Sequence, residues 1–294
     1  MKSGAKKQET GRKRSSIGEV WHRFRKNKGA MLGLCIILVL VLISLTVDLW
    51  LDYDTDVIGM HVTERLQKPS WKHPFGTDEL GRDLLSRVLF GTRFSLSVGV
   101  AAVAIALFCG VVLGSLAGYF GGMVDNAIMR ITDVFSSIPT VMMAIVVVSV
   151  LGASTLNLML AVGITSCPQF VRITRASVIT VRGLEYIESA RAIGKSEPYI
   201  IFRHVIPNSL SPIIVQTTLR VASAIVTASA LSFLGLGIPA PSPEWGALLS
   251  AGRQYIRGYG YLTVFPGLAI MVTVLAFNLM GDGLRDALDP KLKH

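Results

Sequence analysis

Six long apolar stretches, separated by polar segments, dominate the pattern of this chain. Each is close to the length of about 20 helical residues that crosses a hydrocarbon core of about 30 Å. The predicted spans are residues 30–47, 95–118, 135–151, 156–171, 210–233 and 261–280. The third and fourth are short and could be read as one interrupted span, but together they are too long for a single crossing. We therefore expect a hairpin that turns at residues 152–155, and an all-α integral membrane protein with six transmembrane helices.

The composition leads to the same class independently. Hydrophobic residues make up 51% of the 294 residues and charged residues only 16%, and the mean hydropathy is +0.54. A soluble domain of this length carries more charge and less apolar surface. The composition therefore excludes an ordinary soluble protein.

The distribution of Lys and Arg predicts the orientation of the spans. Twenty of the 29 lie in the two terminal segments and in the loops on the same side, eight lie in the loops on the other side, and Arg220 lies inside the fifth span. Positively charged loops stay in the cytoplasm, so both termini and the loop at 184–208 are predicted to be cytoplasmic. The net charge of +10 lies beside the spans and lacks an aromatic stacking surface, which favours lipid headgroups over nucleic acid as the partner.

The chain divides accordingly into five parts. Residues 1–16 read as a disordered tail, and 17–28 as an amphipathic helix at the membrane interface. The predicted parts are a basic cytoplasmic tail with this helix at 1–29, the first transmembrane helix at 30–47, an extracytoplasmic loop at 48–94, a five-helix core at 95–281 that includes the cytoplasmic loop 184–208, and a cytoplasmic C-terminus at 282–294.

The polar, basic segment at 184–208 is the most informative part of the chain. Helix-forming residues run from Leu184 to Gly194, and this glycine can take the left-handed conformation that ends a helix. Ser196 followed by Pro198 predicts the start of a second helix, and Pro207 is expected to mark the return to the bilayer. The segment therefore predicts two short helices between two membrane spans.

Small and charged residues alternate in the first of these helices. Ala190 and Ala192 would let a partner surface come close. Glu188, Arg191 and Lys195 are spaced to form one polar face. Such a combination suits a docking surface, although a Glu-x-Ala triplet by itself is common in solvated connections.

No catalytic, nucleotide-binding or metal site can be assembled from the sequence. The chain contains no Gly-x-x-x-x-Gly-Lys-Ser/Thr phosphate loop, and the Gly-rich stretch at 233–237 lacks the strand and helix context of one. The three cysteines lie in apolar spans without paired spacing, and the five histidines are scattered. We therefore expect a protein that is not an enzyme and that holds no metal or cofactor itself.

Ionisable and polar residues inside the fifth span are candidates for a path across the membrane. Arg220 is costly within a bilayer and is expected to face a cavity, a partner or the interface, with structural pairing as the alternative. Gln216, Ser223 and Thr227 add polarity to the same helix, although hydroxyl groups also serve helix packing. In the extracytoplasmic loop, Asp78 and its neighbours either contact a binding protein or form local salt bridges.

Two parts of the loop carry a family resemblance. The run Glu188-Ser189-Ala190-Arg191-Ala192-Ile193-Gly194, followed at a fixed distance by Ile206-Pro207-Asn208, resembles the cytoplasmic EAA loop of ABC-importer permeases. Further stretches at 73–83, 233–237, 245–246 and 278–290 resemble the C-type permease subunit of dipeptide and oligopeptide importers, a branch that includes nickel importers. The pattern departs at Ser189, which replaces the first Ala, and at His204, which stands where Ile is usual.

The resemblance implies the type I ABC-importer permease fold and a set of partners. These are a related B-type permease in a heterodimer, two ATPase subunits that bind ATP and Mg, and an extracytoplasmic substrate-binding protein, at a bacterial or archaeal plasma membrane. It also implies that the residues docking onto the ATPase are Glu188, Ser189, Ala190, Arg191, Gly194 and Pro207. The expected substrates are di- and oligopeptides, with nickel or another small solute as the alternative. A stand-alone channel, a secondary transporter and a membrane enzyme remain as readings of a different class.

Overall fold

The computed structural model describes residues 16–288 of the chain. The predicted disordered tail up to residue 15, and residues 289–294 of the predicted C-terminus, lie outside the described residues. Within 16–288 the regular elements are all helices, and the only pairing of strand type is an isolated bridge between Thr77 and Asp83. The prediction of an all-α membrane protein is confirmed.

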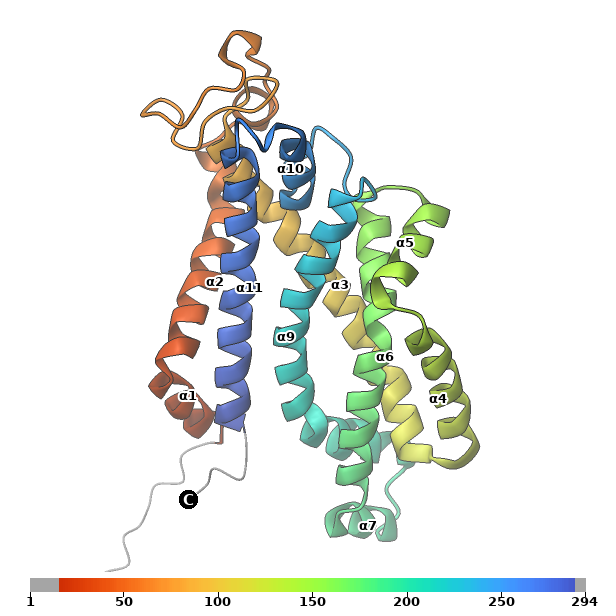
Figure 1. Cartoon of the computed structure of the whole chain (residues 1–294). Coiled ribbons are helices and arrows are strands. Elements are labelled where there is room, and N and C mark those ends of the chain that lie inside the picture. Colours follow the sequence, from red (N-terminus) through yellow and green to blue (C-terminus); the bar gives the residue numbers. More distant parts are fainter. Residues whose placement is uncertain (1–15, 289–294) are drawn as a thin grey trace, which may run out of the picture.

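Five continuous helices are long and apolar enough to cross a membrane. They comprise α2 (Lys28–Thr46), α3 (Leu84–Phe120), α6 (Thr155–Arg182), α9 (Ile206–Phe233) and α11 (Tyr261–Leu288). The shorter helices are α1 (Ser16–Lys26), α4 (Gly122–Ser137), α5 (Thr140–Leu151), α7 (Glu185–Ala192), α8 (Glu197–Ile200) and α10 (Trp245–Gly252). Figure 1 shows the long helices side by side in one bundle, with α10 at one end and α7 at the other. We call these ends the α10 end and the α7 end.

The third predicted span is not one continuous helix. Residues 135–151 are divided between α4 and α5, which are bent by 91° at a short break and are long and apolar enough to cross a membrane only when taken together. Proline disfavours the helical conformation of the residue before it, and Ile138, which precedes Pro139, is extended. The prediction of an unbroken helix was wrong because the apolar character of the stretch concealed this stop signal. The predicted turn after Leu151 is present, since α5 ends there and α6 begins at Thr155.

The second span begins eleven residues before the predicted start. Asp83 caps α3 by accepting a hydrogen bond from the backbone N–H of Ser86 at 2.8 Å. The first turns of the helix carry Arg87 and Thr92, which the apolar pattern assigned to a loop, and Ser95, the first residue of the predicted span. All three side chains are buried in the protein, so polar residues at this helix start contact protein instead of water.

The fifth span also begins earlier than predicted, and Pro207 does not separate it from the loop. Residues Glu197–Phe233 form one helix that includes α8, a five-residue segment Ile201–Val205 and α9. In that segment the N–H of Ile206 donates to the carbonyl of Ile201, which makes the turn one residue wider than an α-helical turn. Because Pro207 lacks an N–H, a widened turn just before it lets the helix continue.

The centre of the bundle is the pair α3 and α6. Three glycines of α3, at spacings of four residues, face α6 so closely that a Cβ atom would meet it at 2.2 Å for Gly110, 2.6 Å for Gly114 and 2.8 Å for Gly118. Small residues let membrane helices approach closely. Helix α9 contacts both members of this pair, α2 lies along α11, and α5 packs on α6.

The loop between α2 and α3 is held by buried charges at the α10 end (Figure 1). The carboxylate of Asp78 accepts hydrogen bonds from Arg82 at 2.7 Å and from Arg87 at 2.5 Å. Arg87 also donates to the carbonyl of Pro241 at 3.3 Å, and the hydroxyl of Tyr261 donates to the carbonyl of Thr77 at 2.9 Å. Of the two roles considered for Asp78, the structure shows the local salt bridges.

Helix α1 and the C-terminal end of α11 lie at the α7 end (Figure 1). Phe24 of α1 is buried with Ala30 and Ala287 in a small apolar cluster. The described ends of the chain are therefore on the same side as the 184–208 loop, as six crossings require. Which side of the membrane this is stays a prediction from the distribution of Lys and Arg.

Candidate functional site

Helix α7 is fixed to the bundle by one apolar face. Ile187 and Ala190 are buried in a cluster with Tyr119 of α3 and with two valines of α6. The remaining members of the cluster are Ile200 and Val205. The ends of two spans and both halves of the 184–208 loop therefore share one small core, which gives the loop a defined position.

Gly194 ends α7 as the sequence predicted. Its φ angle of 81° is in the left-handed region, which costs other residues about 1–2 kcal/mol. The N–H of Lys195 donates to the carbonyl of Ala190 at 3.2 Å, and the N–H of Gly194 to that of Arg191 at 3.0 Å. This pair of bonds is the Schellman arrangement that closes a helix C-terminus. A second helix then begins after Ser196 with Pro198 in its first turn, also as predicted.

A polar triad joins α7 to α8 and to the end of α3. The guanidinium of Arg191 donates to Glu197 at 3.0 Å and to the hydroxyl of Tyr119 at 3.1 Å. Tyr119 in turn donates to the other oxygen of Glu197. The hydrogen bond from Arg191 to Glu197 holds the pKa of Arg191 above its ordinary value. The predicted polar face of Glu188, Arg191 and Lys195 is therefore not wholly available to a partner, because Arg191 already binds Glu197 and Tyr119.

The predicted docking residues differ in exposure. Glu188, Ser189, Gly194 and Pro207 are exposed, and among the described residues Glu188 makes no side-chain hydrogen bond or ion pair. The Ser189 hydroxyl donates to the carbonyl of Glu185 at 2.9 Å. Ala190 is only 8% exposed, so it packs inside the segment and is not part of its outer surface. A direct contact of a partner with Ala190 is therefore not supported by this geometry.

Exposed apolar side chains surround this segment, and sequence reasoning did not single them out. Ile193 and Phe202 are each 74% exposed, and Tyr186 and Tyr199 are also exposed. Large apolar residues at this exposure are typical of a surface that binds another protein. The sequence did contain one signal for this surface, the apolar Ile193 beside the helix-ending Gly194. A search for long apolar spans does not detect a single apolar residue of this kind.

The candidate path residues of the fifth span lie on one stripe of α9. Gln216, Arg220, Ser223 and Thr227 follow at spacings of four, three and four residues, which places them on one side of a helix. Arg220 and Gln216 are half-buried, and neither makes a side-chain hydrogen bond or ion pair within residues 16–288. The two hydroxyl groups bond to carbonyls of their own helix at 3.4 and 2.9 Å. The four side chains thus share one side of α9, and among the described residues no side-chain hydrogen bond joins one of them to another.

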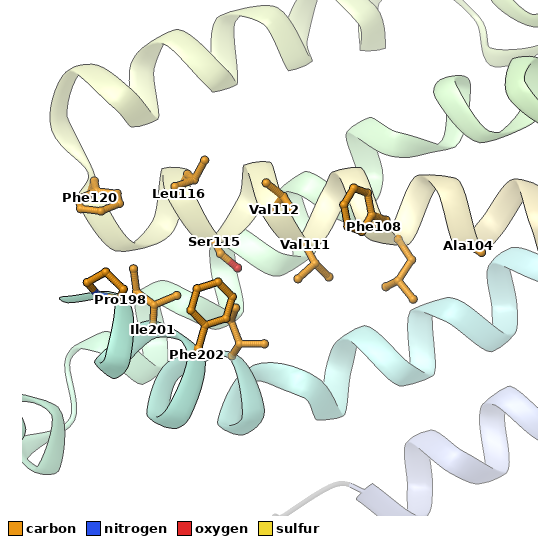
Figure 2. A pocket seen from close by; sticks show the side chains of 12 residues that line it. Ala104, Phe108, Val111, Val112, Ser115, Leu116, Phe120, Pro198, Ile201 and Phe202 are labelled. Atoms are coloured by element: carbon orange, nitrogen blue, oxygen red, sulfur yellow. The ribbon is translucent and has the colours of Figure 1, made fainter. Parts of the chain in front are cut away.

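A groove with a volume of about 710 Å³ lies between α3 and the start of the Glu197–Phe233 helix. Figure 2 shows Phe108, Val111 and Phe120 from α3 facing Ile201 and Phe202. Its lining contains one hydroxyl group, that of Ser115, and no titratable side chain. The groove can hold apolar groups but offers no acid or base for catalysis. Elsewhere in the described part of the chain, no three His, Cys, Asp or Glu side chains are grouped to hold a metal ion.

The comparisons with known proteins agree with one another. Residues 110–294 match the family described as "Binding-protein-dependent transport system inner membrane component". The chain belongs to this family. Residues 15–69 match the "N-terminal TM domain of oligopeptide transport permease C". The two matches together include both ends of the permease and its predicted docking loop.

Curated relatives are similar over nearly the whole permease. The dipeptide transport system permease protein DppC of Alkalihalophilus pseudofirmus is 46% identical over 275 residues, which are 94% of this chain and 90% of the relative. The glutathione transport system permease protein GsiD of Pectobacterium atrosepticum is 44% identical over 276 residues, with 94% and 91% covered. The di/tripeptide permease DppC of Pseudomonas aeruginosa is 43% identical over 286 residues, covering 95% of this chain and 94% of the relative.

Solved structures support the fold. One structure of the MetNI methionine ABC transporter, titled as inward facing, matches with a TM-score of 0.55 at 18% identity over 70% of this chain and 98% of that chain. An amino acid ABC transporter matches with a TM-score of 0.54 at 13% identity, over 69% and 94%. The predicted importer-permease fold is confirmed. The permease is an inner-membrane component of an ABC importer, in which ATP hydrolysis is performed by partner chains, and it works in a complex with an ATPase and a binding protein.

Proposed function

We propose that this permease imports short peptides, di- to oligopeptides, that an extracytoplasmic binding protein delivers, and that its α7–α8 segment docks onto the ATPase. ATP and Mg are bound by two partner ATPase subunits. The observation that carries this proposal is a segment at the α7 end that internal contacts hold in place and whose exposed Glu188 carboxylate has no side-chain partner among the described residues. Closure of the ATPases on ATP moves this segment, and the continuous helix Glu197–Phe233 carries that motion into the membrane.

The form of the docking segment supports its role. The Tyr119–Arg191–Glu197 triad and the shared apolar core join α7, α8 and the ends of α3 and α6 into one unit. Glu188 has no side-chain partner among residues 16–288 and is exposed on this unit, with exposed Ile193 and Phe202 nearby in the sequence. A rigid segment with an exposed carboxylate and exposed apolar side chains is suited to bind a partner protein and to transmit its motion. Ser189, Gly194 and Pro207 are exposed as well.

The relatives support peptides as the substrate. Two of those described above are named for dipeptides or di/tripeptides and one for glutathione, itself a short peptide. Identities of 43–46% over nine-tenths of each chain favour peptides over nickel or another small solute. A stand-alone channel would not require a docking segment of this kind.

The stripe on α9 supports a second permease as a partner. Arg220 is an unpaired ionisable side chain in a membrane span, and such side chains face a cavity or a partner chain because lipid cannot solvate them. We propose that Gln216, Arg220, Ser223 and Thr227 face the path or the interface with a B-type permease in a heterodimer. The predominance of Lys and Arg on the α7 side supports placing that end, and both termini, in the cytoplasm.

The docking role is tested with Glu188→Arg in the assembled importer, by measuring substrate-stimulated ATP hydrolysis and uptake. We expect both to fall by tenfold or more, while the amount of assembled membrane complex is unchanged. The matched control is Asp54→Arg, which reverses an exposed acidic residue without a side-chain partner at the α10 end. Normal coupling in Glu188→Arg would refute docking at this residue.

The substrate and the path are tested together by uptake into vesicles that contain the permease, its partner permease, the ATPases and the binding protein. We expect ATP-dependent uptake of labelled dipeptide and none of labelled nickel. Arg220→Ala is expected to lower peptide uptake or the yield of the heterodimer, whereas Arg257→Ala, an exposed arginine near the α10 end, leaves both unchanged. Uptake of nickel instead of peptide would contradict the proposed substrate, and uptake without ATP would contradict the proposed ATP-driven mechanism.

A further inference from the structure

The break between α4 and α5 leaves helix ends without caps. Ile138 follows α4 without a capping hydrogen bond, and Pro139, at the N-cap position of α5, provides no side-chain cap. Helix ends carry backbone N–H and C=O groups that have no partner inside the helix. Only a few of them are satisfied locally, for example where the Ser137 hydroxyl donates to the carbonyl of Val134 at 2.8 Å.

This break lies at membrane depth. Helix α5 has 12 residues and is therefore only about 18 Å long, which is too short to cross a hydrocarbon core of about 30 Å. Helix α5 ends at the α10 end of the bundle, where the chain turns at Gly152 and continues into α6 (Figure 1). Counting back from that turn, the break falls within the hydrocarbon region.

Lipid cannot be the environment of this break. Every residue from 133 to 142 is exposed in the isolated chain. Irregular backbone at membrane depth occurs where it is buried in protein or lines a water-filled cavity, because acyl chains offer no hydrogen bonds. Residues 16–288 leave the break uncovered, so water, a substrate or another subunit has to cover it.

The surface around the break is polar and hollow. A cavity of about 200 Å³ lies between the break and the middle of α6. Its walls include the hydroxyl groups of Ser136, Thr140 and Thr165 and the amide of Gln169. Pro168, in the same wall, has no N–H to donate to the carbonyl one turn earlier in the helix. The cavity therefore presents neutral donors and acceptors in a part of the membrane that is otherwise apolar.

An ion pair borders the same cavity. Arg172, which lines it, donates to Asp133 at 2.8 Å, and both side chains are about half exposed. Charged residues within a span mark pathways far more often than lipid-facing surfaces. An accessible pair of opposite charges next to an amide, hydroxyl oxygens and the backbone groups of two helix ends matches the chemistry of a zwitterionic peptide, which carries amides and two charged termini.

We infer that the α4–α5 break and the facing turns of α6 form a polar binding wall of the translocation path, where a short peptide in transit hydrogen-bonds to Ser136, Thr140 and Gln169. This inference rests on the proposed function for the identity of the occupant. It adds a second path surface to the α9 stripe, from a span that the apolar pattern predicted to be an ordinary helix.

The wall is tested by the reactivity of single cysteines in the complete importer, after the three native cysteines are replaced by alanine. Ser136→Cys, Thr140→Cys and Gln169→Cys are each treated with a charged, membrane-impermeant thiosulfonate reagent. Leu38→Cys is the control, since Leu38 is 57% exposed near the middle of α2. The thiolate is the reacting form and its pKa rises in apolar surroundings, so we expect the break cysteines to react at least about tenfold faster than the control.

The second measurement is protection by the solute that the uptake experiment identifies. In vesicles that transport a dipeptide, that dipeptide with the binding protein and ATP is expected to slow labelling of the break cysteines severalfold. Labelling no faster than at Leu38→Cys would overturn the wall, and fast labelling that the transported solute never slows would overturn its role in binding. If nickel were the transported solute and gave protection, the proposed peptide function would fail while the position of the wall was supported.

Discussion

Two residues of α7, three positions apart, differ in what surrounds them. Arg191 is joined to Glu197 and Tyr119, whereas Glu188 is exposed and has no side-chain partner among the described residues. Sequence reasoning treated both as members of one polar face. The structure separates a residue that shapes the docking segment from one that is available to a partner, because only the fold brings Glu197 and Tyr119 within reach of the guanidinium.

Arg191→Ala is therefore expected to loosen α7 from α8 without unfolding the permease. The ion pair is about half exposed, so its loss changes the free energy of unfolding only slightly. We expect substrate-stimulated ATP hydrolysis to fall severalfold, measured in the reconstituted complex, while the thermal midpoint stays nearly constant.

Because the two side chains act on each other, Glu197→Ala is expected to produce a similar loss and the double variant no greater one. Additive losses in Arg191→Ala and Glu197→Ala would show that the pair does not act as a brace.

At the scale of elements, the contact between α3 and α6 depends on three glycines. Their spacing of four residues is visible in the sequence, but many membrane helices contain glycine without close packing. The coordinates show that a Cβ at Gly114 would meet Thr174 and the carbonyl of Val171 at 2.6 Å. That approach defines which face of α3 receives α6.

Gly114→Ile is expected to force the two helices apart. Overpacking of a tight contact costs about 1–3 kcal/mol, and here one neighbour is backbone, which cannot move aside as a side chain can. The measurement is the thermal midpoint of the detergent-solubilised complex. Gly267→Ile in α11 is the control, since nothing lies within 4 Å of a Cβ there. Equal stability of the two variants would contradict the close packing.

At the scale of the whole molecule, buried charges at the α10 end connect parts that are far apart in the chain. Asp78 is paired with Arg82 and Arg87, and Arg87 reaches the carbonyl of Pro241. The side chains of Asp78 and of both arginines are at most 7% exposed. The loop after α2, the start of α3 and the loop before α10 are thus held in one arrangement.

Asp78→Asn keeps the shape of the side chain but leaves buried Arg87 without a carboxylate partner, and it leaves Arg82 with only Glu79 at 3.5 Å. Breaking a buried pair in this way costs about 3–5 kcal/mol. We expect faster proteolysis within residues 48–83 and a lower thermal midpoint, both measured on the complex. Asp54→Asn, at an exposed carboxylate of the same loop, should change neither; matching behaviour of the two variants would refute the charge lock.

Much of the local structure followed from the sequence. The helix ending at Gly194, the second start before Pro198 and five long apolar helices could be predicted because each depends on neighbouring residues. Three features could not. The early start of α3 and the burial of Ala190 depend on contacts with distant parts of the chain, and the helix continues through Pro207 by a widened turn that the apolar pattern does not reveal.

The break between α4 and α5 separates what the sequence can predict from what depends on the tertiary structure. Ile138-Pro139 encoded the break locally, but a window that averages hydropathy cannot distinguish a bent span from a straight one. The sequence by itself determined the class of the protein, its apolar helices and the loop that identifies the family, because composition, spacing and turn chemistry are local properties. Only the tertiary structure decided which polar residues are paired, buried or free, since a partner's position depends on how helices far apart in the chain pack together.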